Sequence, residues 1–267
     1  LFKLSVEHAG ATPVCCPINV KTGTIDFDLM ASLITPKTKM IWLCNPHNPL
    51  GKVFTREELQ TIGQLALKHN LWIVSDEIWS NIIYSPARHI SIASLDPDIA
   101  NKTLTLYGFS KDFGLAGLSV GYIISPTKEV KQNIIQHSGC TKTVYGVSVL
   151  AQVAAEAALR YGWDWHTEFI THLYKMRNYA VERLNKIPRI SSNCPEATYL
   201  LLINIESLNM TSQEVCDYLL KAQVAVVPCT PQFFGEGSKG HIRISYATSH
   251  EILKEALDRI EQALNKI

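Results

Sequence analysis

The stretch "MIWLCNPHNPLGKVFTREELQTIGQLALKHNLWIVSDEIW" (residues 40–79) places one helical pattern between two short apolar runs. Residues 40–44 and 71–75 have the length and apolar content of buried strands. Between them, Thr55-x-x-Glu58 is a capping box, which predicts a helix that begins there and ends near Asn70. This order predicts a right-handed β-α-β unit with parallel strands.

The same alternation continues after residue 79. Two further strands are expected in "TLTLY" (103–107) and "VGYII" (120–124). Residues 144–159 are apolar on nearly every side, which predicts a buried helix, whereas residues 166–186 form a long amphipathic pattern. We therefore expect an α/β fold with a mostly parallel sheet flanked by helices.

The C-terminal part has a different pattern, typical of a small α+β domain. Its expected elements are a strand at 199–205, a helix capped by Thr211-x-x-Glu214, strands at 224–227 and 241–245, and a closing helix after Thr248-x-x-Glu251. We predict a larger cofactor-binding α/β domain over residues 1–162. A smaller C-terminal domain, entered through the long helix, is expected over residues 163–267.

The composition is that of an ordinary globular protein. Of 267 residues, 46% are hydrophobic, and 25 basic residues nearly balance 24 acidic ones. The sequence has no run of like charges of the kind that indicates nucleic-acid or membrane binding, so we expect a small-molecule ligand. The seven cysteines include no Cys-x-x-Cys pair, which favours reduced thiols in the cytoplasm and gives no support for a metal site.

Three polar residues follow three of the expected strands. Asn48 lies in the turn after residues 40–44, Asp76 directly follows residues 71–75, and Lys111 comes a few residues after 103–107. Open α/β sheets bind ligands at the carboxyl ends of their strands. One pocket could therefore hold an amide, a carboxylate and an amine.

Each of the three residues also has a purely structural interpretation. Asn48 could be a turn residue between two prolines, Asp76 a helix N-cap, and Lys111 a solvated loop lysine. Their joint placement favours a functional site. The chemistry that uses such a trio is pyridoxal phosphate (PLP) catalysis, with an amine for a Schiff base, a carboxylate for the pyridinium nitrogen and an amide for the ring hydroxyl.

Four motifs occur in an order that resembles a known family. They are "NPHNPLG" (45–51), "SDEIW" (75–79), "SKDFGLAGL" (110–118) and "HIRIS" (241–245). Together they resemble the fold-type I PLP-dependent enzymes of the class I/II aminotransferase superfamily. The resemblance implies the aspartate aminotransferase fold, PLP as cofactor, an amino-acid substrate and a homodimer, with no nucleic-acid or membrane partner.

The resemblance also assigns roles to individual residues. It makes Lys111 the Schiff-base lysine and Arg243 the clamp for the substrate α-carboxylate, assisted by Asn48. The cofactor-binding residues that it implies are Asn48, Asp76, Ile78, Trp79, Ser110 and Lys111. Arg243 has a structural alternative as an edge-strand arginine paired with a surface acid. At Trp79 many aminotransferases have tyrosine, and because indole is only a donor, packing is the expected role.

The reaction type depends on departures from the usual motif. Most aminotransferases that resemble this chain have a phosphate-binding arginine in "AGLRVG", where this sequence has "AGLSVG" with Ser119. The MalY/PatB group of carbon–sulfur β-lyases is similar in lacking that arginine, and also in residues 89–107, 197–205 and 233–245. The motif "SKDFG" (110–114), in contrast, resembles the aminotransferases more than it resembles the lyases.

The sequence is therefore compatible with three functions. The first is a carbon–sulfur β-lyase that converts cystathionine or cysteine-like amino acids to pyruvate, ammonia and a thiol. The second is a class I/II aminotransferase, and the third is an inactive or regulatory homologue of the same fold. The resemblance further implies that Leu1 begins after an N-terminal segment that supplies an aromatic ring for the cofactor and part of its phosphate site.

Overall fold

The protein, seen in a computed structural model that describes residues 2–140 and 146–267, separates into two compact units. The first unit comprises Leu1–Leu33, Asn48–Lys52 and Thr171–Ile267, and the second comprises Ile34–His47 and Val53–Ile170. Each unit contains one sheet. The division into domains at residue 163 stays a prediction.

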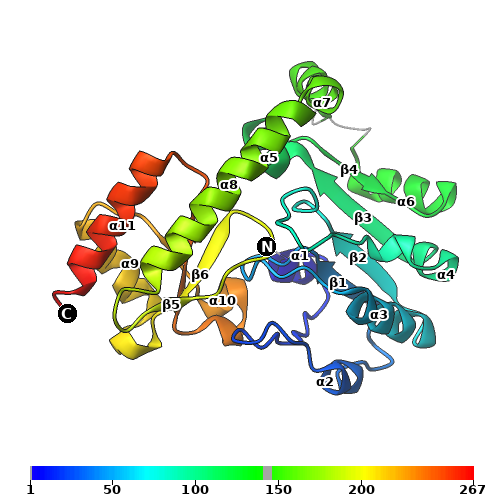
Figure 1. Ribbon diagram of the computed structural model, residues 1–267. Coiled ribbons are helices and arrows are strands. Elements are labelled where there is room, and N and C mark those ends of the chain that lie inside the picture. The colour runs from blue at the N-terminus through cyan, green and yellow to red at the C-terminus, as the bar shows by residue number, and fades with distance from the viewer. Residues whose placement is uncertain (1, 141–145) are drawn as a thin grey trace. The chain divides into compact units, whose positions relative to one another are not determined.

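The sheet of the second unit has the order β1-β2-β3-β4 (Figure 1). Its strands are β1 (Met40–Cys44), β2 (Trp72–Asp76), β3 (Thr103–Gly108) and β4 (Gly121–Ile124). The first three are parallel, whereas β4 pairs with β3 antiparallel. The mostly parallel sheet is therefore confirmed, and the carboxyl ends of β1, β2 and β3 lie along one edge, where Cys44 pairs with Asp76.

Among the described residues of this unit, three α-helices lie between these strands in the chain and three follow β4. They are α3 (Arg56–Lys68), α4 (Pro97–Ala100), α5 (Phe109–Asp112), α6 (Lys128–Ser138), α7 (Val149–Tyr161) and α8 (Trp163–Leu184), the last of which continues into the first unit. The capping box of α3 is confirmed, since Glu58 N donates to Thr55 Oγ1 and Thr55 N donates to the Glu58 carboxylate. Leu59, Ile62 and Ala66 recur at helical spacing and are buried.

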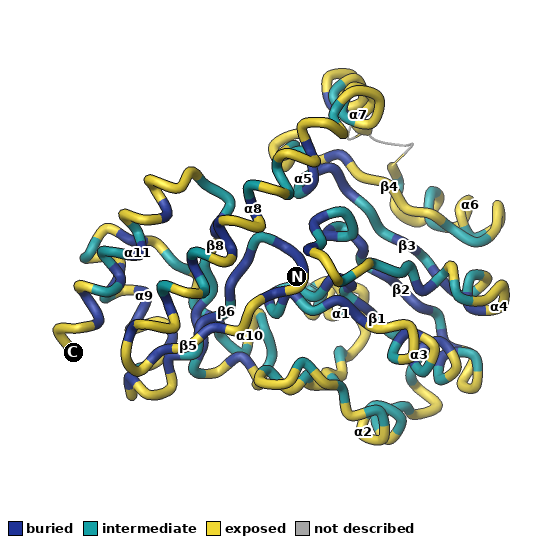
Figure 2. The backbone as a smooth tube through the Cα atoms, viewed as in Figure 1, coloured by how far each residue is buried: buried dark blue, intermediate teal, exposed yellow. Residues whose placement is uncertain are grey.

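The burial expected for the apolar helix at 144–159 is wrong for the part that the structure describes. In α7, Val149 is 74% exposed and Leu150 is 77% exposed, while Ala151 and Ala155 are buried (Figure 2). The reason is that α7 packs by one narrow face against the small cluster around Phe109. Residues 144 and 145 lie outside the described residues.

The sheet of the first unit is antiparallel throughout, with the order β5-β6-β8-β7. Its strands are β5 (Ser191–Ser192), β6 (Leu200–Asn204), β7 (Val227–Pro228) and β8 (His241–Ser245). Its helices are α1 (Phe2–His8), α2 (Phe27–Ser32), α9 (Ser212–Lys221), α10 (Pro231–Phe234) and α11 (His250–Leu264). Helix α9 packs against β7 and β8, and α11 packs against α9.

Two details of this unit correct the sequence-based expectations. The capping box at Thr211 is confirmed, but the N-cap of α11 is Ser249, whose hydroxyl accepts from Ile252 N. The strand expected at 224–227 is reduced to Val227–Pro228, because these are the residues that pair with β8.

Candidate active site

The candidate residues are distributed over both compact units. Asp76, Ile78, Trp79, Ser110 and Lys111 belong to the second unit, and Asn48 and Arg243 belong to the first. Within each unit, the structure brings the expected partners together.

A short turn at the end of β3 positions Lys111. The backbone passes from Gly108 into α5, and Phe109 packs into a buried cluster with Val120 and two alanines of α7. Asp112, the residue after Lys111, is also fully buried. Because Phe109 and Asp112 are held inside, the two residues between them, Ser110 and Lys111, are left half-buried at the surface of the turn.

The Lys111 amine lies above a buried indole. Its Nζ is 5.3 Å from the centroid of the Trp79 ring, a distance at which the ring face attracts a cation. Among residues 2–140 and 146–267, Nζ has no hydrogen-bond or ion-pair partner. The packing role expected for Trp79 is therefore compatible with the structure, and the amine is available for a ligand.

Asp76 is the last residue of β2, and one of its two carboxylate oxygens accepts a hydrogen bond. Ile78 N donates to Asp76 Oδ1 at 3.1 Å, which forms a tight turn. The helix that an N-cap would start is not formed, since residues 78–81 form a turn. In the part of the chain that the structure describes, Oδ2 accepts no hydrogen bond.

Burial raises the pKa of Asp76, and the Ile78 N–H opposes this by stabilising the carboxylate. The negative charge of Glu77 raises the pKa further, whereas the positive charge of Lys111 lowers it. A desolvated carboxylate with one unpaired oxygen is suited to bind a protonated ring nitrogen, because the ion pair offsets the cost of burial.

Glu77, which directly follows β2, is held by its own hydrogen-bond network next to Asp76. Its buried carboxylate accepts hydrogen bonds from Ser75 Oγ (2.9 Å) and Ser91 Oγ (2.8 Å), and it contacts His89 Nε2 at 3.0 Å. Because the hydrogen bond from Ser75 to Glu77 joins the residues on either side of Asp76, this network fixes the backbone that carries Asp76.

Ile78 and Ser110 lie beside these two groups. A side chain at Gly108 would contact Ile78 Cδ1 at 3.3 Å, so Ile78 packs closely against the start of the Lys111 turn. The Ser110 hydroxyl has no hydrogen-bond partner among the described residues. Ser119, the residue that departs from the usual motif, is exposed and has a left-handed backbone with φ of 49°.

In the first unit, Arg243 and Asn48 contact each other directly. Arg243 Nη1 donates to Asn48 Oδ1 at 3.1 Å, and the guanidinium carbon is 5.3 Å from the centroid of the Phe234 ring. Burial lowers the pKa of Arg243. The described residues form no ion pair with Arg243, which excludes the alternative of an arginine paired with a surface acid. The half-buried guanidinium retains donors for a carboxylate.

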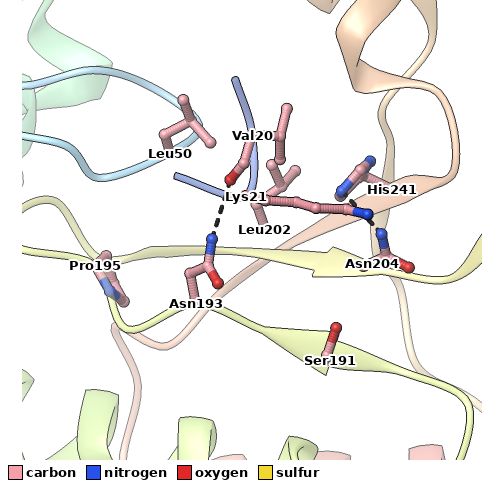
Figure 3. Close-up of a pocket in the computed structure, with 9 residues that line it drawn as sticks. All are labelled: Val20, Lys21, Leu50, Ser191, Asn193, Pro195, Leu202, Asn204 and His241. Atoms are coloured by element: carbon pink, nitrogen blue, oxygen red, sulfur yellow. Dashed lines mark hydrogen bonds between the residues drawn. The ribbon is translucent and has the colours of Figure 1, made fainter. Parts of the chain in front are cut away.

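The first unit also has a cavity of about 150 Å³ that does not include Arg243 (Figure 3). Asn193 Nδ2 donates to Val20 O at 3.0 Å on its wall, and Asn204 Nδ2 contacts His241 Nε2 at 3.4 Å. The cavity is lined by Val20, Lys21, Leu50, Ser191, Asn193, Pro195, Leu202, Asn204 and His241. None of these residues was expected from the sequence to bind a ligand.

Sequence reasoning missed three residues that surround the Lys111 turn. Asn81, Tyr107 and Asp112 form a hydrogen-bonded cluster in the second unit. The available signal was the polar Asn81 inside the apolar run that follows Asp76, together with Asp112 directly after Lys111. Neither position indicates its partner, because the residues are far apart in sequence.

Comparison with known proteins identifies the family. The family described as aminotransferase class I and II matches residues 2–260, and the chain belongs to it. This family is PLP-dependent and consists of enzymes that include aminotransferases and carbon–sulfur lyases. The fold expected from the sequence is confirmed.

Both activities occur among the similar proteins. The bifunctional aspartate aminotransferase and glutamate/aspartate-prephenate aminotransferase of Petunia hybrida is 36% identical over 274 residues, which cover 96% of this chain and 55% of the relative. The cystathionine beta-lyase PatB of Bacillus subtilis (strain 168) is 34% identical over 269 residues, which cover 99% of this chain and 69% of the relative.

The crystal structure of cystalysin from Treponema denticola, which contains a PLP cofactor, matches with a TM-score of 0.92 at 26% identity. The match covers 99% of this chain and 68% of cystalysin. The chain thus spans between about half and two thirds of the length of these proteins.

The residues present fit PLP. The fit rests on two groups of the second unit, the Lys111 amine and Asp76 Oδ2, which are half-buried and have no hydrogen-bond partner in the described ranges. An amine and a carboxylate are the groups that the cofactor's aldehyde carbon and ring nitrogen require.

Asp76 should make the protein less stable at neutral pH when no cofactor is bound. Folding raises the pKa of Asp76. At a pH well below the unfolded pKa of about 3.9, the carboxyl is protonated in both the folded and the unfolded protein, so it contributes nothing to the free energy of unfolding. As pH rises through the unfolded and folded pKa values, ionisation costs the folded state more. The Asp76→Asn variant has no ionisable group at this position and therefore does not lose stability in this way. Its free energy of unfolding in urea should therefore match that of the wild type below about pH 3 and exceed it at neutral pH. Equal or lower stability of the variant at neutral pH would show that the attraction to Lys111 outweighs burial.

Proposed function

We propose that the protein is a PLP-dependent enzyme that acts on an amino acid. The observation that carries this proposal is the pair formed by Lys111 and Asp76, an unpaired amine and an unpaired carboxylate oxygen on residues at or just after the carboxyl ends of two neighbouring parallel strands of one sheet. The family and the PLP-containing neighbour support it. PLP, when bound, supplies an electron sink for charge that develops at the substrate Cα.

The chain's own residues would perform the remaining tasks. Lys111 is the residue that would hold PLP covalently, and its free amine would take the proton from the substrate Cα. Asp76 keeps a proton on the ring nitrogen. Ile78 and Trp79 supply apolar contacts, and Ser110 offers a hydroxyl to the phosphate. Arg243 binds the α-carboxylate, and Asn48 orients its guanidinium.

Within this class, we propose β-elimination at a carbon–sulfur bond as the reaction. Loss of the Cα proton is then followed by departure of the thiolate from Cβ, and hydrolysis yields pyruvate and ammonia. The support is Ser119 in place of arginine, together with the similarity to PatB over 99% of the chain. The MalY/PatB branch remains part of the proposal.

A second candidate is an aminotransferase, favoured by the 36% identity to the Petunia hybrida protein. The two reactions share Lys111, Asp76 and Arg243, and differ in where the proton goes after it leaves Cα. In transamination Lys111 would return the proton with no group leaving Cβ, so the substrate would be released as an oxo acid with its side chain intact.

Product analysis separates these reactions. With PLP present, cystathionine or a cysteine S-conjugate should yield pyruvate and ammonia faster than any amino donor converts 2-oxoglutarate to glutamate. Glutamate without pyruvate would establish the aminotransferase instead. If the protein gives neither product and PLP adds no visible absorbance band, it is the inactive homologue.

We also propose a homodimer through α7. The exposed side chains of this helix include Val149, Leu150 and Tyr161, the last 80% exposed, and a contiguous apolar face of this kind marks an interaction surface. Sedimentation of the wild type at micromolar concentration should show a dimer, and Leu150→Asp should shift it to monomer. Tyr174→Asp, at a 43% exposed position on α8, is the control. A wild type that is only monomeric would contradict the proposal.

The location of the protein in the cytoplasm is likewise proposed, from the seven free cysteines. In the ranges that the structure describes, helices lack the combination of length and apolar character needed to cross a membrane.

A further inference from the structure

A partly buried hydrogen-bond network lies next to the Lys111 turn. Asn81 Nδ2 donates to Asp112 Oδ2 at 2.7 Å and to Tyr107 Oη at 2.9 Å. Tyr107 Oη donates its hydrogen to the same Asp112 oxygen. The three hydrogens therefore fix the orientation of every member, and Asp112 Oδ2 accepts twice while donating nothing.

Burying the Asp112 carboxylate in this cluster is energetically unfavourable. Asp112 has no exposed surface, and its second oxygen, Oδ1, has no hydrogen-bond partner among the described residues. Burial raises the pKa of Asp112, while hydrogen bonds from Tyr107 and Asn81 oppose the rise. Nearby His166 also has a buried nitrogen, Nε2, without a partner in the described ranges. An apolar residue at position 112 would avoid this cost.

The network connects the two segments that carry the candidate site. Asn81 belongs to the segment after β2 that also contains Asp76 and Trp79, and it lies five residues beyond Asp76. Tyr107 and Asp112 bracket Ser110 and Lys111 on the other segment. The backbone hydrogen bond from Glu77 N to Leu106 O joins the same segments closer to the sheet.

We propose that Asp112, Asn81 and Tyr107 are positioning residues for Lys111. Their hydrogen bonds tie the turn that carries Lys111 to the segment that carries Asp76 and Trp79. In this way they hold the Lys111 amine in a fixed position relative to the Asp76 carboxylate. The proposal rests on the proposed function of Lys111. A shift of about 1 Å in a reacting group costs about a hundredfold in rate, which is what gives such a lock its value.

The test compares variants that break the network with one that preserves it. Asp112→Ala and Asn81→Ala remove the connection. Asp112→Asn is the conservative rescue, because an amide oxygen placed at the Oδ2 position still accepts from both donors. Thr103→Val is the matched control, since it removes a buried hydrogen bond (Thr103 Oγ1 to Ile99 O, 2.7 Å) at the opposite end of β3.

Two readouts are taken. The first is amide hydrogen exchange of residues 109–112 in protein without cofactor, and the second is the PLP dissociation constant with the pH midpoint of the bound cofactor's absorbance. Asp112→Ala and Asn81→Ala should each speed exchange and weaken PLP binding by about tenfold or more, and should move the pH midpoint. Asp112→Asn should stay near the wild type, and Thr103→Val should lower global stability alone.

The proposal is overturned if Asp112→Ala and Asn81→Ala behave like Thr103→Val, with lower stability but unchanged local exchange and PLP binding. Should Asp112→Ala fail to fold, Tyr107→Phe decides, since it keeps the ring and removes the hydroxyl that donates to Asp112 and accepts from Asn81. If the wild type does not take up PLP, the proposed function fails, while the exchange readout still decides whether the network orders the Lys111 turn.

Discussion

Replacing Lys111 with alanine is expected to abolish the visible absorbance band of bound PLP and to lower turnover by about 10⁴-fold. One positioned proton-transfer group contributes up to about 10⁴-fold, and the same amine also forms the covalent link to the cofactor. The fold should remain intact, because Nζ has no hydrogen bond or ion pair with the described residues and its indole contact is at 5.3 Å.

Lys102 provides a matched control for Lys111. Its Nζ lies 5.2 Å from the centroid of the Trp72 ring, a similar cation–π contact at the other end of β3, and donates to Asn70 Oδ1 at 2.7 Å. Lys102→Ala should keep the absorbance band and the activity. A Lys111→Ala variant that retains both would remove this lysine from the proposed chemistry.

Replacing Arg243 with alanine is expected to lower kcat/KM by about 10²–10³-fold. Truncating one partner of a buried charge-assisted contact costs about 2–5 kcal/mol, and the guanidinium is already desolvated and held by Asn48 at 3.1 Å. PLP uptake should persist, because Lys111 and Asp76 are unchanged. The measurement is steady-state kinetics with an amino-acid substrate and with the corresponding amine that lacks the α-carboxylate.

The comparison of these two substrates makes the Arg243 prediction specific. The wild type should strongly prefer the amino acid, and Arg243→Ala should lose most of that preference. Arg160→Ala is the control, since its guanidinium is exposed and pairs with Glu156 at 2.7 Å. Equal losses for both substrates would mean that Arg243 supports the structure and does not recognise the carboxylate.

Local sequence signals predicted much of the fold. Thr55-x-x-Glu58 and Thr211-x-x-Glu214 form the capping boxes that they indicated, because both partners lie within one turn. The cap of α11 was misplaced by one residue, since Thr248 and Ser249 are both good N-caps and only the backbone distinguishes them. The burial of α7 was overestimated because an apolar pattern does not reveal which surface covers it.

The candidate site was predictable where a residue's chemistry is distinctive. Lys111, Asp76 and Arg243 stood out because a family motif surrounds each of them. The cluster of Asn81 with Asp112 was not predictable, since 31 residues separate them and each has an ordinary role as a turn residue or cap. Contacts of this kind depend on how two loops meet at the sheet edge.

The most direct test of the central claim is to identify the residue that carries the cofactor. The protein is incubated with PLP, reduced with borohydride to make any lysine linkage permanent, digested, and analysed by mass spectrometry. The account predicts one stoichiometric modification, at Lys111, and its loss in Asp76→Ala as cofactor binding weakens. Modification spread over exposed lysines in proportion to their accessibility, with Lys111 unmodified, would contradict it.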